Sequence, residues 1–164
     1  MTNTIDGRPR LLISRQFLPA ILGMIHAAER SIILATYVVS PVVAKRDGPA
    51  WAVLDALGQA ACRHVSVRFV IESTPREKSG GGANRAAVRL LSKMRVQARL
   101  GPRPLTVHSK FLVADALYVA IGSHNLTNRS LLRNYETSVL FASRDIALEL
   151  HLSFQRLWER SDHA

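Results

Sequence analysis

Eighteen consecutive residues, 108–125, hold the side chains that a phosphate-attacking site needs. His108 supplies an imidazole, which is a nucleophile near neutral pH, and Lys110 supplies a cation. Ser123 and Asn125 add neutral hydrogen-bond donors just after Gly122, where the backbone can turn tightly or approach a ligand closely. Such donors can hold the non-bridging oxygens of a phosphate while charge develops on them. The types and spacing of these residues therefore indicate phosphate chemistry.

A buried strand is expected to carry the first two of these residues. Branched aliphatic and aromatic residues dominate 111–118, which is typical of a strand inside a sheet. Side chains alternate along a strand, so His108 and Lys110 should project side by side from the same face. Asp115 differs from His108 in this alternation, and we expect it to face away and brace the next turn. A second short strand, 118–121, should follow.

The rest of the chain alternates between helical and strand patterns. Strand, helix and strand in succession predict an α/β domain with at least two parallel strands, built as a mixed β-sheet flanked by helices on both faces. Ser14 and Ser143 are the expected N-caps of the first and last helices. The expected elements are helices at 15–30, 49–63, 84–95 and after Ser143, strands at 31–39, 65–72, 96–100 and 135–141, and a loop at 73–83.

The last helix has two apolar sides. One side should pack inward and the other, with Leu148 and Leu152, should be covered by a neighbouring element or a partner chain. The residues expected to face inward are Ile146, Leu150, Phe154, Leu157 and Trp158.

Length and composition predict a single globular domain. The 164 residues fit one domain, 1–164, with its core in about 11–160, and 48% of the residues are apolar. No apolar run reaches the roughly 20 residues of a membrane span, and the first ten residues show no secretory pattern. Cys62 is the only cysteine, which fits a reducing compartment, and we expect it to be a small core residue. These features predict a cytoplasmic protein that has no membrane partner.

Positive charge is concentrated in the segment that runs into His108. The chain has a formal net charge of +10, and residues 76–110 hold nine basic residues against one acid. This pattern favours a polyanionic substrate such as nucleic acid, with a solvated basic helix face as the alternative. His124 could also bind phosphate, or it could simply fill its loop. The candidate substrate-binding residues are Arg76, Lys78, Arg85, Arg103 and His124.

The pattern His-x-Lys-x4-Asp-x6-Gly-Ser-x-Asn, from His108 to Asn125, closely resembles the signature of the phospholipase D superfamily. Glu136 extends the likeness, because related enzymes carry an acid on the next strand. The upstream order of helices and strands also fits, so the resemblance covers about residues 11–160. With one copy of the motif in a short chain, the protein resembles the small bacterial nucleases of that superfamily more than its two-copy lipases and lipid synthases.

The resemblance implies a chemistry that needs no cofactor and no metal ion. One neutral histidine attacks phosphorus to form a phosphohistidine, and a second, protonated histidine gives its proton to the leaving oxygen. Lys110, Ser123 and Asn125 would hold the non-bridging oxygens. Glu136 would orient the imidazole, and Asp115 would give structural support.

The chain supplies one copy of the motif, whereas this chemistry uses two histidines. A twofold homodimer would set His108 against its symmetry mate in a shared site. The leading hypothesis is therefore a metal-independent endonuclease, that is, a phosphodiesterase acting on DNA or RNA. There are two alternatives: a lipid phosphodiesterase or phosphatidyl transferase, and a nucleic-acid-binding subunit without catalysis.

Overall fold

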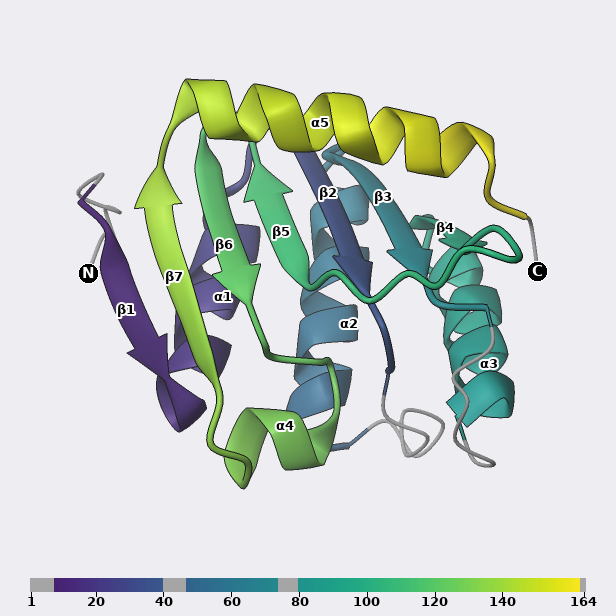
Figure 1. The fold of residues 1–164 in the computed structure, drawn as a ribbon, viewed down its shortest axis with the longest axis horizontal. Coiled ribbons are helices and arrows are strands. Elements are labelled where there is room, and N and C mark those ends of the chain that lie inside the picture. The colour runs from purple at the N-terminus through teal and green to yellow at the C-terminus, as the bar shows by residue number, and fades with distance from the viewer. Residues whose placement is uncertain (1–7, 40–46, 74–79, 163–164) are drawn as a thin grey trace.

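A computed structural model describes residues 8–39, 47–73 and 80–162, and a seven-stranded sheet runs through the centre of the molecule (Figure 1). The strand order across this sheet is β1-β7-β6-β5-β2-β3-β4. The strands are β1 (Arg10–Ile13), β2 (Ser31–Thr36), β3 (Ser66–Ile71), β4 (Gln97–Leu100), β5 (Phe111–Ala114), β6 (Tyr118–Gly122) and β7 (Thr137–Ala142).

The sheet is mixed, as the sequence predicts. Strands β2, β3 and β4 run parallel to one another, whereas β5, β6, β7 and β1 pair in an antiparallel manner. Strand β2 joins the two halves, because it pairs with β3 in parallel and with β5 in antiparallel register. The motif from His108 to Asn125 lies on the antiparallel side of this junction, around β5 and β6.

Helices cover both faces of the sheet, which confirms the expected architecture. The helices are α1 (Phe17–Ala27), α2 (Gly48–Cys62), α3 (Gly80–Lys93), α4 (Asn128–Leu132) and α5 (Arg144–Glu159). Helices α1, α2 and α3 lie behind the sheet in Figure 1, and α5 crosses its front face. The larger apolar core fills the space behind the sheet, around side chains such as Phe69 and Leu57. A smaller core, with Phe154 and Trp158, lies beneath α5.

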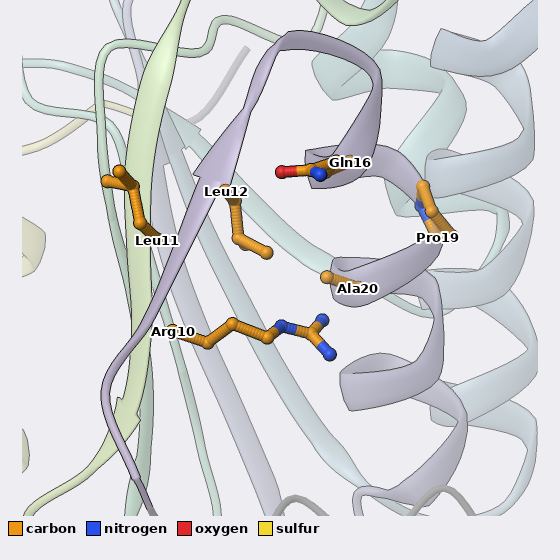
Figure 2. A pocket seen from close by; sticks show the side chains of 6 residues that line it. All are labelled: Arg10, Leu11, Leu12, Gln16, Pro19 and Ala20. Carbon is orange, nitrogen blue, oxygen red and sulfur yellow. The ribbon is translucent and has the colours of Figure 1, made fainter.

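The start of helix α1 differs from its prediction. A short 3-10 turn, Ser14–Gln16, precedes α1, and the Ser14 side chain does not cap that helix. Ser14 has a positive φ of 49° and its main-chain N–H donates to the Glu136 carbonyl at 2.8 Å, so the residue turns the chain instead of starting a helix. In the groove between β1 and α1, Arg10 and Leu12 point toward α1, whereas Leu11 points to the opposite face (Figure 2).

Helices α2 and α5 were also predicted, and some of their residues lie elsewhere than expected. Cys62 is the last residue of α2 and is exposed, so the expectation of a core residue is wrong: its position at the helix end leaves it outside the packed face. On α5 the Ser143 side chain accepts a hydrogen bond from the Ile146 main-chain N–H at 3.3 Å, which confirms the predicted N-cap. Ile146 itself is exposed instead of inward-facing, and Leu148 and Leu152 are exposed on α5 as well.

His108 and Lys110 do not lie on a strand, contrary to the prediction. Strand β5 begins at Phe111, and the two residues belong to an irregular segment, 101–110, that crosses the front of the sheet (Figure 1). The physical reason is the length of the neighbouring strand, because β2 ends at Thr36 and its last pair with β5 is Ala35 with Phe111. The register that sets Ala35 opposite Phe111 would set Thr36 opposite Lys110, so the residues before Lys110, including His108, have no β2 residue opposite them.

Candidate active site

Five residues singled out by the sequence line one cleft with a volume of about 550 Å³. The cleft lies where β5 begins, β6 ends and β7 begins, and α5 borders it through Leu150 and Ser153. The segment before β5, the turn after β6 and the residue before β7 each contribute side chains to it. The five residues are His108, Lys110, Ser123, Asn125 and Glu136.

Lys110 and His108 contact each other directly. The ammonium Nζ of Lys110 lies 3.1 Å from the imidazole Nδ1 and donates to the His108 carbonyl at 2.5 Å. Burial lowers the pKa of Lys110 below its ordinary value, and the negative charge of Glu136 offsets this only in part. A charged ammonium can only donate, so Nδ1 accepts and a neutral His108 carries its proton on Nε2.

Tyr37, just beyond the end of β2, packs against both of these residues. Its ring centroid lies 4.8 Å from that of His108 with a tilt of 58°, and the Lys110 ammonium lies 5.6 Å from the Tyr37 ring centroid. A cation over an aromatic face is attracted by the ring quadrupole. Sequence reasoning missed Tyr37, although an aromatic residue at the end of an expected strand was a usable signal.

Glu136 holds Ser123 in place. The Ser123 hydroxyl donates to Glu136 Oε2 at 2.5 Å, while Ser130 and Asn134 donate to Oε1 at 2.8 and 3.1 Å. Burial alone would raise the pKa of Glu136, but these hydrogen bonds and the nearby imidazole of His124 outweigh it and lower the pKa. Glu136 is therefore a carboxylate at neutral pH. Ser130 and Asn134 were missed because they lie outside the motif.

Within one chain, Glu136 does not orient the His108 imidazole as expected. Among the described residues, no hydrogen bond joins Glu136 to His108, and the carboxylate oxygens of Glu136 accept from Ser123, Ser130 and Asn134. Glu136 acts on the cleft through Ser123 and through its charge. The imidazole meets Lys110 and Tyr37 instead.

Asn125 has an unused side-chain amide. Its main-chain N–H donates to Ser130 Oγ at 2.9 Å, which fixes the backbone of the turn after β6. Its side-chain Oδ1 is buried and has no hydrogen-bond partner among the described residues. A buried acceptor in that state favours a hydrogen-bond donor, because leaving it unpaired costs free energy. The Nδ2 amide of the same side chain, and not Oδ1, is the group that can donate to an oxygen of a bound phosphate.

His124 is a structural residue in this fold, not part of the cleft surface. Its ring is 2% exposed and stacks on Phe17 with centroids 4.2 Å apart. Nε2 lies 3.0 Å from the Ser14 carbonyl, which can only accept, and Nδ1 lies 2.7 Å from Ser138 Oγ. Burial lowers the pKa of His124. Both ring nitrogens are occupied, so the geometry offers no nitrogen to a phosphate, contrary to the candidate substrate-binding role.

Asp115 lies at the other end of β5 from the cleft. Its carboxylate accepts main-chain N–H groups of Glu29, Arg30 and Ser31 at 3.0, 2.8 and 2.9 Å. Burial would raise the pKa of Asp115, but these bonds and the Arg30 charge lower it. The residue ties the start of β2 to the turn between β5 and β6, away from the reacting groups.

The candidate substrate-binding arginines lie outside the cleft lining. Arg85, on α3, and Arg103, after β4, are both exposed, and Arg76 and Lys78 fall outside the described residues. Closer to Glu136 the structure shows a basic residue that the sequence reasoning overlooked. Arg129, on α4, donates to Asn134 Oδ1 at 3.2 Å, and Asn134 in turn donates to Glu136.

Comparison with known proteins assigns the chain to a family. A family model described as "Cardiolipin synthase, PLD-like domain" matches residues 21–158. The chain belongs to this family. As a PLD-like domain it is 34% identical over 131 residues to cardiolipin synthase A of Pseudomonas putida strain W619, covering 75% of this chain and 24% of that protein. The chain thus spans about a quarter of the length of the curated relatives that it matches.

Solved structures show the same fold. Nuc from Salmonella typhimurium, a phospholipase D family member, has a TM-score of 0.78 at 20% identity and covers 96% of this chain and 99% of its own. NucT from Helicobacter pylori has a TM-score of 0.73 at 17% identity with the same coverage of 96% and 99%. The sequence prediction of a phospholipase D-like fold is therefore confirmed.

Within residues 8–39, 47–73 and 80–162, no cluster of three histidine, cysteine or acidic side chains is arranged to hold a metal ion. In the same ranges, no helix combines the length and the apolar character needed to cross a bilayer.

Proposed function

We propose that this PLD-like domain is a metal-independent phosphodiesterase that cleaves DNA or RNA, with an active site shared by two copies of the chain. The observation that carries the proposal is the meeting of His108, Lys110, Ser123 and Asn125 in one cleft. An imidazole nucleophile and an ammonium can supply the attack and charge stabilisation that other phosphodiesterases take from metal ions. The formal net charge of +10 supports a polyanionic substrate.

The contact between Lys110 and His108 suggests how substrate binding starts the reaction. While Lys110 donates to Nδ1, the neutral imidazole keeps its proton on Nε2 and cannot attack through that atom. A phosphate in the cleft offers Lys110 a better acceptor, since hydrogen bonds between charged groups are stronger. Lys110 then leaves Nδ1, which can take the ring proton, and Nε2 becomes the nucleophile.

The chemical steps follow from this arrangement. His108 Nε2 attacks phosphorus, the P–N bond forms, and the P–O bond to the leaving oxygen breaks as a second imidazolium protonates that oxygen. Water then attacks the phosphohistidine, gives its proton to the second imidazole and releases His108. Lys110 and the Asn125 Nδ2 amide hold the non-bridging oxygens through both steps, and Ser123 joins them when its hydroxyl proton turns from Glu136 Oε2 to the phosphate.

Among the described residues, His108 is the one histidine that lines the cleft, so the proposal takes the second imidazole from another copy of the chain. An apolar surface beside the cleft fits that copy. Leu11, Val139, Ile121 and Phe111 pair across β1, β7, β6 and β5, and form one row on the α5 face of the sheet. Leu11 is 57% exposed and Ile121 is 40% exposed.

The α5 helix extends this surface. Leu148 and Leu152 are exposed on it, and Leu150 of the same helix lines the cleft together with Ile121. Exposed apolar side chains that continue into a catalytic cleft mark an interaction surface. A second copy related by a twofold axis would cover the row and α5 and bring its own His108 to the shared site.

A lipid substrate is the second candidate, and two observations favour it. The matched curated relatives are named cardiolipin synthase A. The apolar row and the exposed leucines of α5 could also meet acyl chains, while basic side chains attract anionic lipid as well as nucleic acid. In this reading the domain is a phosphatidyl transferase or lipid phosphodiesterase.

A cleavage panel in excess EDTA tests the proposal. Plasmid, single-stranded DNA and RNA would be incubated with the full chain, beside anionic phospholipid vesicles. We expect nucleic-acid cleavage that EDTA does not abolish and that His108→Ala removes. Turnover of lipid alone would establish the second candidate. Binding of nucleic acid without any cleavage would support the non-catalytic subunit.

A further inference from the structure

The segment that carries His108 has little main-chain support of its own. Residues 101–110 cross the front of the sheet without joining a strand (Figure 1). Gly101 donates its N–H to the Ile71 carbonyl at 2.8 Å, and the Lys110 carbonyl accepts from Gly122 at 3.2 Å. Between these two anchors the chain depends on side-chain contacts to fix the imidazole.

Glu72 supplies the missing contact. It follows β3 directly, is 2% exposed, and its Oε2 accepts the main-chain N–H of Val107 at 2.5 Å. Among the described residues, this is the only hydrogen bond that ties the main chain of 102–109 to another element. Val107 directly precedes His108, so the bond fixes the backbone from which the nucleophile projects.

A second buried residue fixes Glu72 in turn. Asn84, near the start of α3, is fully buried and donates through Nδ2 to the main-chain carbonyls of Glu72 and Tyr37, both at 2.9 Å. Its Oδ1 accepts from the Val39 main-chain N–H at 2.9 Å. The same side chain thus holds the end of β3, which carries Glu72, and the end of β2, which carries the ring that packs on His108.

We propose that Glu72 is a positioning residue that holds the His108 imidazole in line with the phosphate, an inference that rests on the proposed function. Hydrogen bonds to a carboxylate are stronger than those between neutral groups, and burial strengthens them further. The bond from Val107 to Glu72 therefore fixes the main chain of an irregular segment, as hydrogen bonds to a neighbouring strand would fix a strand. A misplacement of about 1 Å in a nucleophile can cost about 100-fold in rate.

Three variants at position 72 distinguish the effect of side-chain length from the effect of side-chain charge. Glu72→Gln keeps an oxygen at the same reach, and its amide can donate to Ser73 Oγ, which now donates to Glu72 Oε1 at 3.4 Å. Glu72→Asp keeps the charge but is one methylene too short for the Val107 amide. Glu72→Ala removes both. Ser143→Ala is the matched control, because it removes a side-chain acceptor from a main-chain N–H on α5, away from the cleft.

The measurements are kcat and KM for the nucleic acid that the wild type cleaves, together with hydrogen exchange at the Val107 amide. We expect Glu72→Asp and Glu72→Ala to lower kcat by about 10- to 100-fold at an almost unchanged KM. Exchange at Val107 should accelerate in both variants. Glu72→Gln should stay within about threefold of wild type in kcat, since one neutral hydrogen bond replaces a charge-assisted one. Ser143→Ala should lose thermal stability and keep its kcat.

Two results would overturn the proposal. One is a Glu72→Asp variant with wild-type kcat and a poorly active Glu72→Gln, because charge and not reach would then matter. The other is wild-type exchange at Val107 in Glu72→Asp. If Glu72→Ala does not fold, the comparison of kcat and Val107 exchange between Glu72→Asp and Glu72→Gln still tests the proposal. A wild-type chain that cleaves no nucleic acid would defeat the proposed function, while exchange at Val107 would still show whether Glu72 holds the segment.

Discussion

Lys110 and His108 hold each other through two contacts, one from the ammonium to the imidazole Nδ1 at 3.1 Å and one to the His108 carbonyl at 2.5 Å. Under the proposed function, the cation that binds phosphate is thus the group that contacts a ring nitrogen of the nucleophile. Binding and activation would then be one event, because moving Lys110 onto the phosphate frees the imidazole.

Replacing Lys110 should therefore remove phosphate binding in the transition state. We expect Lys110→Ala to lower kcat by about 100- to 1000-fold, the usual cost of losing one group that stabilises developing charge. Single-turnover cleavage measures this, with Lys93→Ala on the exposed side of α3 as the matched control. A Lys110→Ala variant within a few-fold of wild type would contradict the assigned role.

If two chains share one active site, adding inactive chains should lower the cleavage activity of the wild-type chains. Wild type mixed with excess His108→Ala should form mixed dimers that hold a single cleft histidine, and its activity should fall as chains exchange. Time courses of cleavage after mixing measure this effect. Activity that stays equal to the wild-type amount added would mean that each chain works alone.

The apolar surface beside the cleft should be needed for assembly. We expect Leu152→Glu and Leu11→Glu to give monomers in sedimentation experiments and to lose cleavage although neither residue lines the cleft. Burying a charge in an interface without a partner is strongly unfavourable. Ser92→Glu adds the same charge on α3, behind the sheet, and should leave both properties unchanged. A dimeric and active Leu152→Glu would place the interface elsewhere.

His124 should make stability fall in mildly acidic solution. Burial lowers the pKa of this imidazole in the folded chain, whereas the unfolded chain has the ordinary value of about 6.5. The unfolded state then binds the proton more readily, so stability is full above that pH and decreases as the pH falls below it. Urea unfolding at pH 7.5 and 5.5 measures the loss. In His124→Gln the difference between the two pH values should shrink.

Asp115 should contribute stability in a different pH range. Its three main-chain bonds lower its pKa in the folded state, so its contribution is full above the unfolded value and disappears as the pH falls through the folded one. Asp115→Asn should lose about 1.5 kcal/mol at pH 7, or roughly 3–6 °C in Tm. The gap to wild type should be smaller at pH 3 than at pH 7 in thermal scans. An equal gap at both pH values would contradict this account.

The sequence predicted the cleft residues well because most of them are close together in the chain. His108, Lys110, Ser123 and Asn125 come from neighbouring segments whose strands pair as a hairpin, so their spacing alone indicates a common site. The mixed sheet with helices on both faces also follows from the order of the patterns. The N-cap at Ser143 is local chemistry and was predicted for that reason.

What the sequence could not predict depends on contacts between distant segments. Glu72 meets Val107 across 35 positions in the chain, and no local pattern indicates that bond. The start of β5 at Phe111 depends on where β2 ends, and so the strand prediction for His108 failed. Helix α4 was not predicted, and its N-cap is Thr127, whose hydroxyl accepts from the Ser130 main-chain N–H at 3.0 Å.

Cys62 gives this chain a practical property. It is the only cysteine, it is exposed, and it ends α2 on the side of the sheet opposite α5. A thiol-reactive fluorophore would therefore attach at one defined position, away from the cleft and from the surface assigned to the second copy. Donor- and acceptor-labelled populations mixed together would report subunit exchange by energy transfer, in real time and on a chain whose cleft residues are all native.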